Sequence, residues 1–421
     1  DTCTVNVIPW PDYQYIPVPG KAPVENVFSG KAGVNSTVIE AFDGDISLVF
    51  ETATFLADTD VTIERLDPDS VPAGYVRGSS VFDISFDGKE PRKPVSLIAR
   101  FDNQASDGIN PLKFALYRWD DDSSGWVYAG GAVSAEKGVV VAEIETPGRY
   151  MLMAYDRTFV DILTHWSREE VEILASRHVV DGYGKNDFRP ENQITRAEFV
   201  KLVMSMVPYC PYVEAARSKK TESYNDVSVD KWYFPYVEAA TELGIVAGSG
   251  GYFRPESPVT REEMALILIR IFNTPAEMEQ VAGEYQLLFK DSDEISEWAL
   301  GAVVLAYQKG IIRGDDDGRF RPKDYAKRAE AAAVILRTME NLGFIKAPET
   351  LKGTLRVVDI EGTHFELECS CPSKKTYYVI IPADSIIEKQ LKLFIDSEVQ
   401  ITGILQEGAN IYMRGPVLKA L

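Results

Sequence analysis

Short apolar runs separated by turn residues dominate residues 21–157. Gly, Pro and Asp stand between the runs, and each run has the length of a β-strand. Strands are expected at Ile46–Phe50, Val61–Glu64, Phe82–Phe86, Val95–Ala99, Phe114–Trp119, Gly125–Tyr128 and Val139–Ile144. Many short strands at regular spacing predict an antiparallel β-sandwich over 21–157.

A similar pattern of strands occupies the last part of the chain, residues 346–421. Strands are expected at Gly353–Val358, Phe365–Cys369, Tyr377–Ile381, Val399–Leu405 and Ile411–Met413, with a short helix near Ser385–Leu391. Five strands and one small helix predict a small OB-like β-barrel. Acidic and basic residues nearly balance here, so nucleic-acid binding has no electrostatic support in this part.

The middle of the chain follows a helical period and repeats itself three times. Four features recur in one order: an aromatic residue two positions before an Asp, a Trp, a Phe-Arg-Pro triplet, and a helix start of the Thr-Arg-Ala-Glu type. The repeated Asp residues, Asp161, Asp226 and Asp291, are 65 positions apart. We therefore divide this region into repeats at 158–223, 224–288 and 289–345.

Each repeat predicts a helix, a glycine-rich turn and a second, strongly apolar helix; we expect the three second helices to share a core. The first helix of the second repeat, Trp232–Leu243, is expected to end at Gly244, a natural left-handed cap residue. The Phe-Arg-Pro triplet is expected to be extended, because a residue before proline avoids the helical region. Thr195 and Thr260 stand where an N-cap belongs, each with a Glu three residues later, as in a capping box. Lys327 replaces this Thr in the third repeat, so the cap is expected to be lost there.

Residues 1–20 form a segment of their own. Thr2–Ile8 alternates like a strand, and four prolines follow it. One interpretation is an edge strand of the sandwich followed by a linker. The other is a strand donated to the sheet of a neighbouring subunit.

Composition narrows the classes of function. The 421 residues include 64 acidic and 44 basic side chains, a net charge of −20, which argues against nucleic-acid binding as the main role. No apolar run approaches the roughly 18 residues of a membrane-spanning helix. No charged-then-apolar leader is present, so we expect any signal peptide to have been removed. The three His and four Cys stand in no zinc, redox or nucleophile arrangement, so no catalytic residue, metal or cofactor is expected.

The repeated residues between Phe159 and Leu342 resemble the S-layer homology domain, a family usually present as three tandem copies. The resemblance implies a pseudo-threefold helical bundle whose grooves hold secondary cell-wall polysaccharide, often capped by a pyruvylated sugar. It implies an extracellular protein of the bacterial cell wall or S-layer that is anchored non-covalently. The expected whole is a multidomain α+β chain: sandwich, bundle and barrel.

Four residue types of each repeat are the candidate polysaccharide ligands. They are Asp161, Asp226 and Asp291; Trp166, Trp232 and Trp298; Gly182, Gly248 and Gly314; and Arg196, Arg261 and Arg328. An Arg presents a planar donor fork to the carboxylate of a pyruvyl ketal, and free N–H groups at a helix start favour the same anion. A Trp suits the apolar face of a sugar, an Asp accepts from hydroxyls, and a Gly lets a ring approach the backbone. The third site is expected to be the weakest, because its helix cap is missing.

Structural roles compete with these binding roles. Each Trp suits the core as well as a ligand, and each Asp suits the cap of the first helix. The Arg residues are assigned to binding, because an Arg beside an N-cap has no packing duty that requires it. The acidic loops Asp181–Asp187 and Asp315–Asp317 would suit calcium. The second repeat has no carboxylate in the corresponding Gly248–Tyr252, so a repeated calcium site is not expected.

Two other classes of function stay open. One is a wall-anchored enzyme that acts on polysaccharide with the sandwich or the barrel. The other is a subunit of an extracellular filament or lattice that uses the repeats, or a donated N-terminal strand, for self-association.

Overall fold

The computed structural model describes residues 26–67, 71–101, 108–135, 137–184, 186–207, 210–284 and 289–346, and then five strands and a two-residue turn of the last part. The expected N-terminal strand and the expected helix near Ser385 lie outside the described residues. The chain divides into two compact units, Tyr155–Met339 and a unit made of 1–154 with 340–421. Among the described residues, no helix has the length and apolar character needed to cross a membrane.

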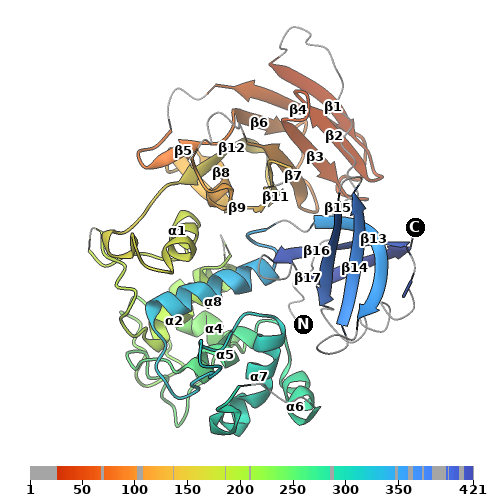
Figure 1. Cartoon of the computed structure of the whole chain (residues 1–421). Helices are drawn as coiled ribbons and strands as arrows, with labels where there is room; N and C mark the ends of the chain where they lie inside the picture. The colour runs from red at the N-terminus through yellow and green to blue at the C-terminus, as the bar shows by residue number, and fades with distance from the viewer. Residues whose placement is uncertain are drawn as a thin grey trace. The chain divides into compact units, whose positions relative to one another are not determined.

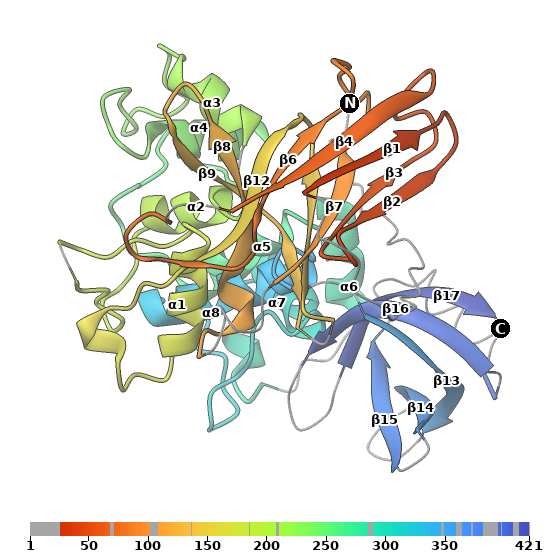
Figure 2. The ribbon, with the colours of Figure 1, turned by 90° about the horizontal axis from the view of Figure 1, so that it is seen from above.

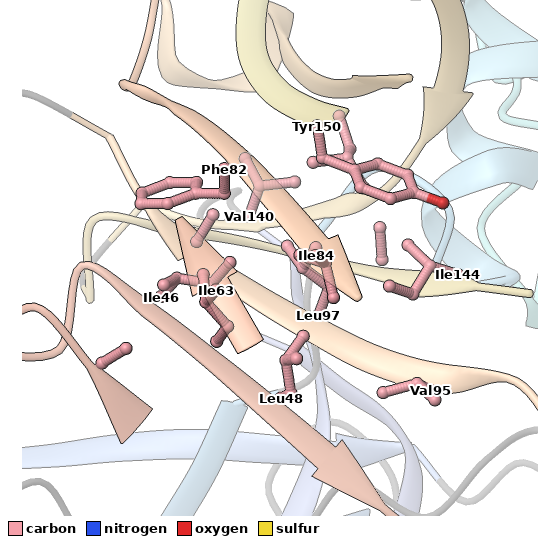
Figure 3. Packing of buried hydrophobic residues seen from close by; sticks show 14 of the residues in the cluster. Ile46, Leu48, Ile63, Phe82, Ile84, Val95, Leu97, Val140, Ile144 and Tyr150 are labelled. Atoms are coloured by element: carbon pink, nitrogen blue, oxygen red, sulfur yellow. The ribbon is translucent and has the colours of Figure 1, made fainter. Parts of the chain in front are cut away.

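The first part forms two antiparallel sheets that share a core, as predicted (Figure 2). One sheet has the order β1 (Val27–Ala32), β4 (Thr59–Leu66), β6 (Val81–Ser85), β12 (Gly148–Tyr155), β8 (Phe114–Asp120) and β9 (Gly125–Gly130), and β5 (Tyr75–Arg77) also pairs with β12. The other has the order β10 (Ala132–Ser134), β11 (Val139–Ile144), β7 (Val95–Arg100), β3 (Ile46–Phe50) and β2 (Thr37–Ala41). Figure 3 shows Phe82, Ile84 and Tyr150 of the first sheet facing Leu48, Leu97 and Val140 of the second.

The strand β12 is central to its sheet, yet the sequence pattern did not predict it. Its residues Tyr150–Ala154 are all buried, so it lacks the alternation of a strand with one wet face. Tyr150 and Leu152 point into the shared core, while Met151 and Met153 pack with Tyr117 in a second cluster on the other face. A strand covered on both faces reads as a continuous apolar run, which periodicity alone does not distinguish from a helix.

The last part is a closed five-stranded barrel (Figures 1 and 2). Its strands are β13 (Glu349–Val358), β14 (His364–Cys371), β15 (Lys374–Ile381), β16 (Glu398–Gln406) and β17 (Tyr412–Ala420). The order around the barrel is β13-β14-β15-β17-β16, and β15 and β17 run parallel. All five predicted strands are present, and the OB-like class of the barrel stays a prediction.

The repeats form a helical unit (Figure 1). Their first helices are α1 (Arg168–Ser176), α4 (Phe234–Glu242) and α7 (Glu297–Gln308), and their second helices are α2 (Arg196–Met204), α5 (Arg261–Ile269) and α8 (Arg328–Asn341). The connections between repeats carry two further helices that were not predicted, α3 (Pro211–Arg217) and α6 (Pro275–Glu284). The chain leaves α4 through Gly244 at φ 71°, as expected, and Gly310 (φ 59°) and His178 (φ 59°) take the same conformation after α7 and α1.

A closed triangle of backbone hydrogen bonds joins the three repeats. It involves the residue before each N-cap position: Ile194, Val259 and Ala326. The N–H of Ile194 donates to Ala326 (3.0 Å), that of Ala326 to Val259 (2.9 Å), and that of Val259 to Ile194 (3.1 Å). Each repeat is thus bonded to both others, and the third is bonded back to the first.

Candidate functional site

The repeated Asp residues hold the Phe-Arg-Pro triplets. The carboxylate of Asp226 accepts the backbone N–H groups of Phe253 (2.8 Å) and Arg254 (2.8 Å). Asp161 accepts those of Phe188 and Arg189, and Asp291 those of Phe320 and Arg321. The proposed alternative role as caps of the first helices is therefore wrong, since Ser167, Tyr233 and Ser296 occupy those N-cap positions.

The triplets are also not extended, which corrects the sequence-based expectation. Arg189, Arg254 and Arg321 have φ values of 60°, 62° and 54°. The rule for residues before proline disfavours the right-handed helical region, but it leaves this left-handed conformation accessible. A non-glycine residue is strained there. The hydrogen bonds that the backbone N–H groups of each triplet donate to the Asp offset that strain.

The repeated glycines make room for an aromatic ring of their own repeat. A Cβ added to Gly248 would lie 2.4 Å from the ring of Tyr224 and 2.5 Å from the carbonyl oxygen of Tyr252. At Gly182 the corresponding distances are 2.4 Å to Phe159 and 2.6 Å to a backbone oxygen, and at Gly314 they are 3.1 Å and 3.3 Å. The close approach that glycine allows is thus already used within the fold, and an approach by a sugar ring stays a prediction.

The helix starts confirm the capping boxes at Thr195 with Glu198 and at Thr260 with Glu263. The third repeat retains half of the box, because the backbone N–H of Lys327 still donates to Glu330 (2.8 Å). The expected loss of the cap there is therefore only partial.

The N–H groups at these helix starts are not free for an anion. The first two of α2, from Arg196 and Ala197, donate to the carbonyls of Ser257 (2.9 Å) and Pro255 (3.0 Å) in the second repeat. Those of α5 donate in the same way to the third repeat, and those of α8 to the first. The third N–H of α2 donates to the Thr195 hydroxyl. The expectation that these groups bind a ligand carboxylate is therefore wrong.

The Arg that recurs at each of the three helix starts reaches into the next repeat. Arg196 donates from Nε to the carbonyl of Phe253 (3.1 Å) and from Nη1 to Glu263 (2.9 Å). Arg261 makes the same bonds to Phe320 and Glu330, and Arg328 donates from Nε to Phe188 (2.9 Å). Each guanidinium also lies over the ring of the Phe whose carbonyl it contacts. The argument that these residues have no packing duty is wrong, although ligand contact stays a prediction.

We group the candidate residues by these contacts into three inter-repeat sites, in which each Arg joins the next repeat around the ring and each Trp is assigned to the site of its own repeat. Site 1 contains Asp161, Trp166, Gly182 and Arg328; site 2 contains Asp226, Trp232, Gly248 and Arg196; site 3 contains Asp291, Trp298, Gly314 and Arg261. Bonds next to Trp166 agree with this grouping. His165, beside Trp166, bonds to Glu191, which pairs with Lys327 of the third repeat (2.5 Å).

The three Trp side chains are exposed, not part of the core. Trp166, Trp232 and Trp298 have exposed fractions of 57%, 53% and 54%. The alternative that they anchor the core is therefore wrong. An exposed indole at the same position of three repeats offers a flat apolar surface with one polar N–H, which suits a sugar ring.

A polar hollow of about 470 Å³ lies beside Asp291 of site 3. Its lining includes Asp291 and charged side chains of both signs: Glu294, Asp317, Arg319, Arg321, Lys323 and Asp324. The acidic loop beside it is held by its own contacts. Asp315 accepts the N–H groups of Asp317 and Arg319 (3.0 Å each) and pairs with Arg321, and the Arg319 N–H is the largest cause of its lowered pKa. Among the described residues, no group of three or more His, Cys, Asp and Glu is placed to hold a metal ion.

The family model of the S-layer homology domain matches residues 158–200, 223–265 and 288–332. These three matches begin just before the repeated Asp residues and end in the second helices, so they contain the whole of the inter-repeat contacts described above. The chain therefore carries three tandem S-layer homology domains, as the repeated motifs predicted.

Several curated proteins are similar to this chain. An amylopullulanase of Thermoanaerobacterium thermosulfurigenes is 33% identical over 277 residues, which is 64% of this chain and 14% of that protein. The exoglucanase XynX of Acetivibrio thermocellus is 36% identical over 189 residues, 44% of this chain and 16% of that protein. The S-layer protein sap of Bacillus anthracis is 27% identical over 218 residues, 52% of this chain and 24% of that protein. The chain thus spans less than a quarter of the length of each of these relatives.

Proposed function

We propose that this chain anchors a bacterial surface protein to the cell wall by binding secondary cell-wall polysaccharide at its inter-repeat sites. The observation that carries the proposal is the exposed Trp at one position in three S-layer homology domains. Relatives named as S-layer proteins support a location at the cell surface or in an S-layer. The cyclic hydrogen bonds between repeats support a pseudo-threefold bundle that presents three similar sites.

Each site offers complementary chemistry to an acidic sugar. The Trp stacks on the apolar face of a sugar ring. The Arg supplies positive charge for a ligand carboxylate, such as that of a pyruvyl ketal. Charged side chains of both signs, as in the hollow at site 3, bind the hydroxyl groups.

A sedimentation assay with purified cell walls tests the proposal. The protein is expected to sediment with intact walls and to stay in solution once the non-peptidoglycan polymer has been extracted. Replacing Trp232 and Trp298 together by Ala is expected to lower the affinity at least about tenfold, since each loses a stacking contact worth about 1 kcal/mol or more. Leu56→Ala is the control, because this side chain of the sandwich is 69% exposed. Undiminished binding to extracted walls contradicts the proposal.

A second candidate function is a wall-anchored enzyme that acts on polysaccharide. The relatives named amylopullulanase and exoglucanase favour it. The alignment with the amylopullulanase covers 277 residues, more than the stretch from 158 to 332 that the family model spans, so it includes residues outside the repeats. Release of reducing sugar from starch, pullulan, xylan or purified wall polymer would favour this candidate, whereas an anchor binds without turnover.

Self-association into a lattice or filament is a third candidate, and it depends on the N-terminal strand predicted from the sequence. Light scattering of the full chain and of a chain without residues 1–20 separates the cases. Donation of the strand predicts large particles for the full chain that disappear on truncation.

A further inference from the structure

The three inter-repeat sites differ at the residue that follows the conserved glycine of each repeat. The first repeat has Tyr183 at this position, the second has Ser249, and the third has Asp315. The Tyr contacts Arg328 of the third repeat, whereas Asp315 bonds within its own loop and to Arg321.

In site 1 the Tyr183 side chain lies between two arginines and a glutamate. Its ring is 4.5 Å from the guanidinium carbon of Arg328 and 4.6 Å from that of Arg189. Its hydroxyl donates to Glu198 and accepts from Nη1 of Arg328 (3.4 Å). Burial and the bond to Glu198 raise the pKa of Tyr183, so the phenol is neutral at physiological pH and remains a donor to the carboxylate.

All three guanidinium nitrogens of Arg328 bond within the fold. Its Nε donates to Phe188, its Nη1 to Tyr183, and its Nη2 to the carbonyl of Asp181 (3.1 Å). Its side chain is only 9% exposed. Each of the three guanidinium nitrogens therefore has a partner inside the fold, and neither Nη1 nor Nη2 keeps both of its hydrogens for a ligand carboxylate.

Arg196 and Arg261, in sites 2 and 3, are engaged differently. Each donates from Nε to a Phe carbonyl and from Nη1 to a Glu. Among the described residues, no group bonds to Nη2 of either Arg. Their side chains are 12% and 15% exposed. Each thus keeps one nitrogen with two donor hydrogens for an external anion.

We infer that sites 2 and 3 bind the carboxylate of the wall polymer and that Tyr183 closes site 1. The inference rests on the proposed function and names which sites perform it. It replaces the expectation that the third repeat binds most weakly. Lys327 and Arg328 of that repeat contribute to site 1, whereas site 3 receives its Arg from the second repeat and has the polar hollow beside its Asp291.

Calorimetric titration of the full chain with a methyl glycoside carrying a 4,6-linked pyruvyl ketal tests the inference. The glycoside without the ketal is the control ligand. Two ketal-dependent sites are expected for the wild type. Trp232→Ala and Trp298→Ala are each expected to remove one of them.

Tyr183→Ser, which introduces the residue of the second repeat, is expected to raise the number of sites to three. Tyr183→Phe keeps the ring in place and is expected to retain two. Adding Trp166→Ala to Tyr183→Ser is expected to return the number from three to two. Three sites in the wild type, or no gain in a folded Tyr183→Ser protein, overturns the inference.

A measurement on the wild type does not depend on how the variants fold. The indole N–H signals of Trp232 and Trp298 in an NMR spectrum are expected to shift during the titration, while that of Trp166 stays in place. A shift at Trp166 equal to the other two contradicts the closure of site 1 and leaves the proposed function intact. No ketal-dependent shift at any of the three contradicts the proposed function itself.

Discussion

The Nε–H group of Arg328 donates to the carbonyl oxygen of Phe188, a residue 140 positions earlier in the chain, at 2.9 Å. This bond joins the last repeat to the first. It has counterparts from Arg196 to Phe253 and from Arg261 to Phe320. The same side chains that the sequence marks as ligands are thus part of the contacts that hold the repeats together.

Arg328→Ala is expected to destabilise the helical unit by about 2–4 kcal/mol, because the buried carbonyl group of Phe188 and the carbonyl group of Asp181 lose their donors. Urea unfolding followed by circular dichroism at 222 nm measures the change. Arg217→Ala is the matched control, since Arg217 is 51% exposed, pairs with Glu214 across one helical turn and makes a cation–π contact with Tyr236 at 6.0 Å. The Arg217→Ala variant is expected to lose less than about 0.5 kcal/mol of unfolding free energy. Equal losses in the two variants would show that Arg328 has no special structural role.

Replacing the repeated glycines by Ala is expected to destabilise the protein by unequal amounts. Gly248→Ala brings a Cβ to 2.4 Å from the Tyr224 ring and 2.5 Å from a backbone oxygen, whereas Gly314→Ala leaves 3.1 Å and 3.3 Å. Overpacking of this kind costs about 1–3 kcal/mol, and we place Gly248→Ala at the upper end and Gly314→Ala at the lower.

Thermal unfolding of both variants, measured beside wall binding, decides what these glycines do. A Gly248→Ala protein with unchanged stability and lost binding would show that the glycine serves the ligand and not the Tyr224 ring.

The stability of the helical unit is expected to fall as the pH drops below about 6.5, the usual pKa of a histidine. Burial lowers the pKa of His178, with Asp181 opposing the shift and Arg157 adding to it. The unfolded chain therefore binds a proton at pH values where the folded chain does not. The contribution of His178 to the free energy of unfolding is complete above about pH 6.5 and is lost as the pH falls toward its folded-state pKa.

His178→Gly is the matched variant for this test, because glycines at positions 244 and 310 take the same left-handed conformation in the other repeats. The variant is expected to lose less of its unfolding free energy than the wild type between pH 7.5 and pH 5.5. Urea unfolding at the two pH values measures the difference. Equal losses of unfolding free energy in the two proteins would show that groups other than His178 cause the pH dependence.

The sequence predicted the parts of the fold that depend on neighbours along the chain. Capping boxes, the left-handed turn at Gly244 and most of the strands follow from local spacing. The roles of Arg196, Arg261 and Arg328 do not, because their partners lie between 57 and 147 positions away in another repeat. The left-handed Arg254 was likewise not predicted, since it depends on the hydrogen bond that its backbone N–H donates to Asp226, 28 residues earlier.

The candidate site was predicted as a set of residues but not as an arrangement. The repeat length alone assigns each Arg to the Trp and Asp of its own repeat. In the structure, each Arg lies in the site of the next repeat. This grouping follows only from the ring of bonds between Ile194, Val259 and Ala326, which joins residues far apart in the chain.

That ring of backbone bonds also bears on how the protein is made. The chain is synthesised from its N-terminus, so Ile194 and Val259 emerge from the ribosome well before Ala326. Until the third repeat arrives, Ile194 has no acceptor for its N–H, Ala326 offers no donor to Val259, and α8 has not yet supplied Arg328 to site 1. The first two repeats therefore lack part of their inter-repeat contacts during synthesis, and the ring of three repeats closes only when the last helix is in place.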